Sequence, residues 1–254
     1  MNRQLAEILE KIQKIPEGKK VYEGPEGICF TRDHLYWYDQ YFNEIDLPEE
    51  VEGNFDCSNT GIISFEGCPK IIRGFFSCLG TNITSLEGCP EIVGESFYCS
   101  YTKITSLEGC PKIVNGNFDC SYTRITSLKG APRVVGENFN CTSTKLTSLE
   151  GSPREVGGNF WCFDTKLTSL EGSPREVGGS FNCSYTYIAS LEGGPKKVGG
   201  SFNCSNTDIT SLEGSPREVG GNFWCSVTNI SSLKGAPAKI GSFEYSRFPN
   251  SISA

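Results

Sequence analysis

The sequence predicts a repeat solenoid that is mainly β, with one short parallel strand in each 21-residue coil and little helix outside an N-terminal cap. Nine cysteines, from Cys57 to Cys225, stand 21 residues apart. Their residue numbers differ by 168 from first to last, which is eight intervals of 21. A phenylalanine stands two residues before each of these cysteines, and a Gly-x-Pro sequence begins ten residues after each. Self-similarity at such a period is typical of coils that stack on their neighbours and bury a shared core. The length of the array therefore counts coils and not globular domains.

Three segments are expected along the chain: an N-terminal cap at 1–44, the solenoid at 45–242 and a C-terminal cap or tail at 243–254. In the first cap, apolar residues at i, i+3, i+4 and i+7 from Leu5 to Ile12 predict an amphipathic helix that ends at Pro16. Aromatic strands or a hairpin should follow around residues 31–33. The register drops one residue before Phe243, where the array ends. Caps are needed because terminal coils expose apolar faces.

Charge and hydropathy bear on whether the protein binds nucleic acid, is secreted or enters a membrane. The net charge of −7 gives no support to general nucleic-acid binding. No segment approaches 18 apolar residues, and Glu7 and Glu10 interrupt the region where a secretory signal would be apolar. We therefore expect a cytoplasmic protein with no membrane segment.

Each slot of the unit has an expected structural task. Phenylalanine and cysteine, two residues apart, should point inward from one strand, and the buried cysteines should remain reduced. A threonine three residues after each cysteine should supply hydrogen bonds to the backbone of its own coil and the next. A serine seven residues after each cysteine forms a second structural hydroxyl ladder. A row of glutamates that begins at Glu66 and a row of lysines and arginines that begins at Lys70 should pair along the back.

The segment F-x-C-S-x-T-x-I-T-S-L resembles the leucine-rich repeat, with Thr in the place of the asparagine ladder. The phrase LTSLEGSP is similar to bacterial effector repeats and to repeat proteins of tailed bacteriophages. The resemblance covers about residues 45–242 and implies a concave strand face that binds a partner. Two departures are that Thr replaces Asn, and that Val or Ile precedes Phe by four residues instead of three, which predicts a bulge. Effector ligases also carry a catalytic domain, for which this chain leaves no stretch long enough.

The sequence contains no catalytic constellation and no cofactor motif, so we expect no enzyme, no metal and no cofactor. His34 is the single histidine, and a convergent set of acid, base and nucleophile is missing. The cysteines recur once per coil without the partners of a zinc site.

Outward slots near the strand vary between coils and are therefore the candidate partner-binding surface. Exposed Trp, Tyr and Arg are enriched at binding hot spots, and four successive cations form a basic row. The candidate residues are Tyr98, Tyr101, Lys103, Tyr122, Arg124, Lys145, Trp161, Phe163, Lys166, Tyr185, Tyr187 and Trp224.

The leading hypothesis is a non-enzymatic interaction protein that binds a partner protein with an acidic surface. If the resemblance to phage proteins extends to function, the partner is a host factor such as a defence protein, in the host cytoplasm. One alternative is a small anionic ligand, a nucleotide or glycan, held by the Tyr, Lys and Arg rows. Another is a structural or ice-binding solenoid that uses its threonine ladder.

Overall fold

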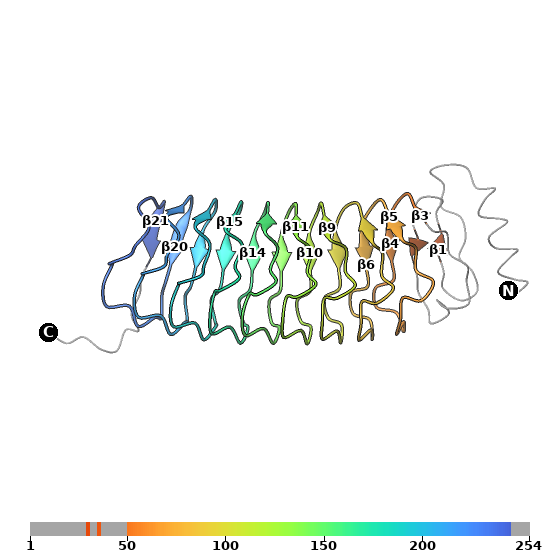
Figure 1. Ribbon diagram of the computed structural model, residues 1–254, viewed down its shortest axis with the longest axis horizontal. Helices are drawn as coiled ribbons and strands as arrows, with labels where there is room; N and C mark the ends of the chain where they lie inside the picture. The colour runs from red at the N-terminus through yellow and green to blue at the C-terminus, as the bar shows by residue number, and fades with distance from the viewer. Residues whose placement is uncertain (1–28, 31–34, 37–49, 245–254) are drawn as a thin grey trace, which may run out of the picture.

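A computed structural model describes residues 29–30, 35–36 and 50–244, and these form a parallel β-solenoid (Figure 1). Two sheets run along its length. The phenylalanine sheet has twelve strands in chain order. They are β1 (Cys29–Phe30), β2 (Leu35–Tyr36), β4 (Phe55–Asp56), β6 (Phe76–Ser77), β8 (Phe97–Tyr98), β10 (Phe118–Asp119), β12 (Phe139–Asn140), β14 (Phe160–Trp161), β16 (Phe181–Asn182), β18 (Phe202–Asn203), β20 (Asn222–Trp224) and β21 (Ser242–Glu244).

The valine sheet has nine strands, again one per coil. They are β3 (Glu50–Val51), β5 (Ile71–Ile72), β7 (Ile92–Val93), β9 (Ile113–Val114), β11 (Val134–Val135), β13 (Glu155–Val156), β15 (Glu176–Val177), β17 (Lys197–Val198) and β19 (Glu218–Val219). The prediction of a parallel solenoid is confirmed, but most coils contain two strands where we expected one. Val or Ile four residues before Phe belongs to this separate strand, so the predicted bulge was wrong.

Consecutive coils pair in register. Phe118 lies opposite Phe139 in the phenylalanine sheet, and Val135 lies opposite Val156 in the valine sheet. At the C-terminal end Phe223 pairs with Phe243, so the dropped residue is absorbed without loss of register. Figure 1 shows a straight stack without a horseshoe bend, because strands on both sides advance by one rung per coil. The strand face is therefore flat, whereas the family resemblance implied a concave one.

At the N-terminal end, β1 and β2 pair antiparallel, in the segment where a hairpin was expected, and β2 pairs parallel to β4. The amphipathic helix expected in the cap lies outside the described residues, as does the tail at 245–254. No helix in the described part of the chain is long and apolar enough to cross a membrane.

Stacked phenylalanines form the centre of the core. From Phe55 to Phe243, ring centroids in adjacent coils lie 5.0–5.7 Å apart with interplanar angles of 8–26°. This offset stacking adds to the burial of apolar area. Valine, isoleucine and leucine from the other sides of each coil complete one continuous hydrophobic cluster.

The cysteine ladder is buried and free, as predicted. All twelve cysteines whose side chains are described are free thiols. In eight of the nine coils the thiol at this slot donates to a carbonyl of the next coil, with Sγ–O distances of 3.1–3.7 Å. Burial raises the pKa of these thiols, to about 11 for Cys225 and further for the others of the ladder. Such thiols are neutral and unreactive near pH 7.

The threonine ladder acts within each coil and not between coils. Each threonine hydroxyl donates to the carbonyl oxygen of the cysteine three residues earlier, at 2.6–2.8 Å. In seven coils the serine seven residues after the cysteine accepts from the backbone N–H two residues on, as Ser106 does from Glu108. Both rows brace their own coil, and the expectation that the threonine hydroxyls also bond to the next coil was wrong.

The polar ladder between coils lies instead one residue before each phenylalanine. There the Asn or Ser side chain accepts from the backbone N–H of the same slot in the next coil, at 2.7–3.2 Å. This slot contains Asn or Ser in every coil except at Phe75. It is the structural counterpart of the asparagine ladder that we had assigned to threonine.

Candidate functional site

The candidate residues fall on two adjoining surfaces that meet at a sharp turn. Tyr98, Trp161 and Trp224 face outward from the phenylalanine sheet. Two residues after each ladder cysteine, the chain turns with a positive φ. Beyond that turn, the backbone pairs again with the preceding coil, as where the Lys103 N–H donates to the Ile83 carbonyl at 3.0 Å.

The turn slot adopts the left-handed conformation in all nine repeats. Its φ angles are 54–58° in the eight coils with a side chain and 71° at Gly80. Asn, Asp and Gly tolerate this conformation, whereas bulky residues are disfavoured. The sequence nevertheless places Tyr101, Tyr122 and Tyr185 there. These three tyrosines occupy positions where local stability favours Gly or Asn.

The turn tyrosines are exposed. Tyr101, Tyr122 and Tyr185 retain 57%, 50% and 63% of their accessible surface. The rings of Tyr101 and Tyr122 stack with centroids 4.4 Å apart, and they form a rigid aromatic pair. Partial desolvation and the neighbouring Tyr122 raise the pKa of Tyr101, so its hydroxyl stays protonated near neutral pH. Tyr185 has no aromatic partner among the described residues.

Beside the turn lies the basic row of Lys103, Arg124, Lys145 and Lys166, all exposed. None of the four has an ion-pair partner within 4.0 Å in the described part of the chain. Strand spacing places successive rungs about 4.8 Å apart. The row ends where the Lys166 ammonium lies 5.0 Å from the centroid of the Tyr187 ring and 3.2 Å from its hydroxyl oxygen.

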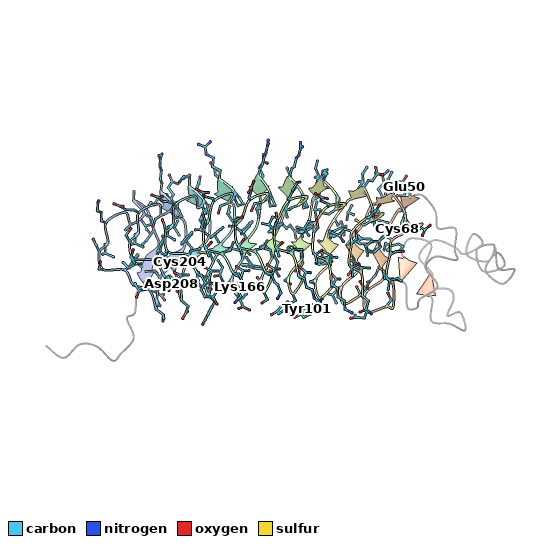
Figure 2. The ribbon with its side chains drawn as sticks, turned by 60° about the horizontal axis from the view of Figure 1, so that its bottom comes forward. Glu50, Cys68, Tyr101, Lys166, Cys204 and Asp208 are labelled. Carbon is cyan, nitrogen blue, oxygen red and sulfur yellow. The ribbon has the colours of Figure 1, made fainter. Side chains whose placement is uncertain are left out.

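We call this set the tyrosine–lysine edge; in Figure 2, Tyr101 and Lys166 lie toward the same long side of the solenoid. Its residues are Tyr101, Lys103, Tyr122, Arg124, Lys145, Lys166, Tyr185 and Tyr187.

The remaining candidates are less exposed and are spread over the sheet. Trp161, Trp224 and Phe163 are half-buried. Trp161 and Trp224 lie three coils apart, so they do not form one cluster. Tyr98 packs edge-to-face against Phe75 at a centroid distance of 6.2 Å, which gives it a structural role.

Part of the variation that marked this face in the sequence has a structural cause. Asp and Asn in the slot after phenylalanine accept from the backbone N–H two residues on, at 2.9–3.1 Å. They cap the turn that follows, a use for which Asp and Asn are suited. The aromatic members of this slot, Tyr98, Trp161 and Trp224, cannot cap the turn in this way.

No group of three or more His, Cys, Asp or Glu side chains in the described part of the chain is arranged to hold a metal ion. A depression of the surface lies on the valine sheet, and none of the twelve candidate residues lines it. In comparisons with known proteins the chain matches no family model, no curated protein and no solved structure, so its function is inferred from its own residues.

Proposed function

We propose that this chain is a non-enzymatic interaction protein that binds an acidic surface of a partner protein through the tyrosine–lysine edge. The observation that carries the proposal is the placement of Tyr101, Tyr122 and Tyr185 in the left-handed turn slot. A bulky residue there costs on the order of 1–2 kcal/mol relative to an ordinary conformation. Strained, exposed aromatic residues are expected where binding repays that cost.

The charge of the edge supports an acidic partner. Lys103, Arg124, Lys145 and Lys166 are four unpaired cations in consecutive coils, on a protein whose net charge is −7. Such a local field of opposite sign to the whole molecule steers an acidic partner to one orientation. Trp161 and Phe163 adjoin the edge and extend the contact area onto the phenylalanine sheet.

We further propose, from the resemblance to leucine-rich repeats of bacteria and phages, that the partner is a host protein such as a defence factor and that the encounter takes place in the cytoplasm.

Two alternatives are less well supported. A small anionic ligand needs an enclosed site, and the described depression lies elsewhere. The ice-binding hypothesis relied on a threonine ladder that is buried in all but the last coil. A second threonine row, from Thr84 to Thr168, is exposed, but it lies two residues from the charged basic row.

Co-purification from bacterial lysate with mass spectrometry tests the proposal. The first variant carries Lys103, Arg124, Lys145 and Lys166 each changed to Glu. A second carries Tyr101, Tyr122 and Tyr185 each changed to Asn, which suits the turn and removes the aromatic surface. A protein captured by the wild type and lost from both variants supports the proposal, provided circular dichroism shows both to be folded.

A matched control reverses exposed charges that lie outside the edge, at Lys129 and Lys234. This variant should retain the partner. Equal capture by the wild type and the two edge variants would assign the interaction to another surface.

A further inference from the structure

The ion pairs of this solenoid differ from those expected from its sequence. The described residues contain four: Lys70–Glu91, Arg73–Glu50, Lys129–Glu108 and Lys234–Glu213. None joins the row of glutamates that begins at Glu66 to the row of cations that begins at Lys70. The expectation that these two rows pair along the back was therefore wrong.

One row on the valine-sheet side contains six consecutive cations, which we call the arginine row. All are exposed, and none has an ion-pair partner within 4.0 Å among the described residues. Like charges on neighbouring rungs repel, by about 1 kcal/mol at 4 Å in water. The members are Lys112, Arg133, Arg154, Arg175, Lys196 and Arg217.

The surface is hollowed beside this row. An open depression of about 1010 Å³ is lined by Arg154 and Arg175 and by Gly157, Gly178 and Gly199. The three glycines contribute only backbone to the lining, beside side chains such as those of Pro153 and Pro174. Neighbouring coils approach so closely that a Cβ on Gly178 would lie 2.1 Å from the carbonyl oxygen of Gly157. A side chain at this glycine position is thus sterically excluded.

An apolar stripe lies at the N-terminal end of the same face. The first residue of each valine-sheet strand points outward, while the second is buried. This outward slot contains Ile92 and Ile113, which are 54% and 57% exposed. Further along it contains Glu155, Glu176 and Lys197. The face is therefore apolar toward one end and charged toward the other.

The two binding surfaces are separate. Glu50, which begins the same outward slot in β3, lies on the opposite side of the solenoid from Tyr101 and Lys166 (Figure 2). A ligand on the arginine row would therefore not compete for the tyrosine–lysine edge.

We propose that this face is a second docking surface, for an extended acidic peptide segment of a partner protein. Carboxylates of the peptide would pair with Arg154, Arg175 and Arg217, since guanidinium binds carboxylate bidentately. Apolar residues at one end of the peptide would contact Ile92 and Ile113. From Ile92 to Arg217 the occupant spans roughly six intervals of 4.8 Å, about nine residues in extended conformation.

The neighbouring carboxylates favour a peptide over a nucleic acid. Glu155 and Glu176 alternate with Arg154 and Arg175 in the depression, and together with Lys197 these lining residues have a net charge of +1. A nucleic-acid strand, with a phosphate at every nucleotide, would be repelled at these positions. A peptide with spaced carboxylates avoids them. The inference does not depend on the function of the tyrosine–lysine edge.

Fluorescence anisotropy with a synthetic peptide tests this proposal. The probe is a fluorescein-labelled peptide of about nine residues, the extended length of the face, with valines at one end and alternating Glu and Ser at the other. The wild type should bind it, and changing Arg133, Arg154 and Arg175 to Glu should weaken binding at least tenfold. Changing Ile92 and Ile113 to Ser should weaken binding of this peptide severalfold. The same change should not affect binding of a control peptide that lacks the valines.

A control variant with Lys129 and Lys234 changed to Glu, two exposed cations outside both surfaces, should bind the peptide as the wild type does. The variant with Lys103, Arg124, Lys145 and Lys166 changed to Glu tests whether the peptide binds the tyrosine–lysine edge instead. Loss of binding in that variant alone would overturn the assignment to the arginine row. An oligothymidylate with the same charge as the peptide is a second probe. If the wild type bound it more tightly than the peptide, and the arginine-row variant did not bind it, the ligand would be a nucleic acid and the peptide proposal would be overturned. No binding of the peptide by the wild type would overturn the proposal itself.

Discussion

Alkaline pH should unfold this protein, because its core contains buried thiols that must stay protonated. The twelve cysteines with described side chains are free thiols, and burial raises their pKa above the ordinary value. Loss of solvation is the largest cause in each case, and it raises the pKa of Cys110 to about 12. An unfolded thiol titrates at about 8.5.

The sign follows from proton binding. Above pH 8.5 the unfolded chain loses thiol protons that the folded chain retains, so the unfolded state is favoured as the pH rises. The stability that these thiols contribute is complete below the unfolded pKa and is lost as the pH rises toward the folded pKa. Relative to neutral pH, each thiol lowers the free energy of unfolding by about 0.4 kcal/mol at pH 8.5 and about 1.4 kcal/mol at pH 9.5.

Summed over the twelve buried thiols, the loss is about 5 kcal/mol at pH 8.5 and about 17 kcal/mol at pH 9.5. A domain is typically stable by about 5–15 kcal/mol. The protein should therefore be clearly weakened at pH 8.5 and unfolded at pH 9.5. Below pH 10, tyrosine and lysine contribute little to this titration.

Equilibrium urea unfolding, followed by far-ultraviolet circular dichroism with a phosphine reductant present, measures the effect at pH 7.0, 8.5 and 9.5. Samples should approach equilibrium from both the folded and the unfolded side. A free energy of unfolding that changes by less than about 2 kcal/mol between pH 7.0 and 8.5 would refute the reasoning.

A matched variant tests whether the thiols are responsible. Cys68, Cys89 and Cys110 occupy a turn slot that contains Ala131 and Ser152 in later coils, so replacing these three cysteines by Ala should be tolerated. The variant has three of the twelve described thiols fewer, so its loss of unfolding free energy between pH 7.0 and 8.5 should be smaller by about a quarter, or roughly 1 kcal/mol. An unchanged pH dependence would assign the effect to other groups.

Three substitutions test the packing. Phe139→Ala removes a buried ring that stacks on both neighbours and should cost about 3–5 kcal/mol in urea unfolding, whereas a loss below about 1 kcal/mol would contradict the stacked core. Asn138→Ala removes the acceptor for the Asn159 N–H and should cost about 1–3 kcal/mol, measured against Thr147→Ala on the exposed surface, for which no loss is expected. Val227→Asn relieves a β-branched residue at φ 57° and should stabilise the protein by about 1 kcal/mol in the same assay, so a destabilised variant would argue against strain at this turn.

Much of the fold was predictable because one slot repeats without interruption. Phenylalanine and cysteine, two residues apart in every unit, determine which face of the strand is buried, and the structure buries both. The valine strands were missed because only one residue of each is buried, so no pair of apolar residues two apart marks them in the sequence. The ladder between coils had a visible signal, Asn or Ser before Phe, but Phe75 interrupts it.

The candidate surface was harder to predict, because period-two reasoning fails at a turn. The residue after phenylalanine and the residue four after cysteine are both outward, yet the left-handed residue between them redirects the chain. Counting alternate residues along one strand therefore placed Trp161 and Lys166 on the same face. In the structure Trp161 lies on the phenylalanine sheet and Lys166 on the adjoining tyrosine–lysine edge. The arginine row was visible in the sequence, but only the structure shows that it does not pair with the row of glutamates that begins at Glu66.

The uniform register means that this protein can change its surface by whole units. Deleting residues 158–178 would join Gly157 to Gly179 and leave an equivalent residue at every slot on both sides of the junction. The shortened rod would lose one rung, about 4.8 Å, and no core contact would lack a replacement. Its outer rows, however, would be brought into a new alignment. Unequal recombination between repeats could therefore produce new recognition surfaces in one step, on a framework that continues to fold.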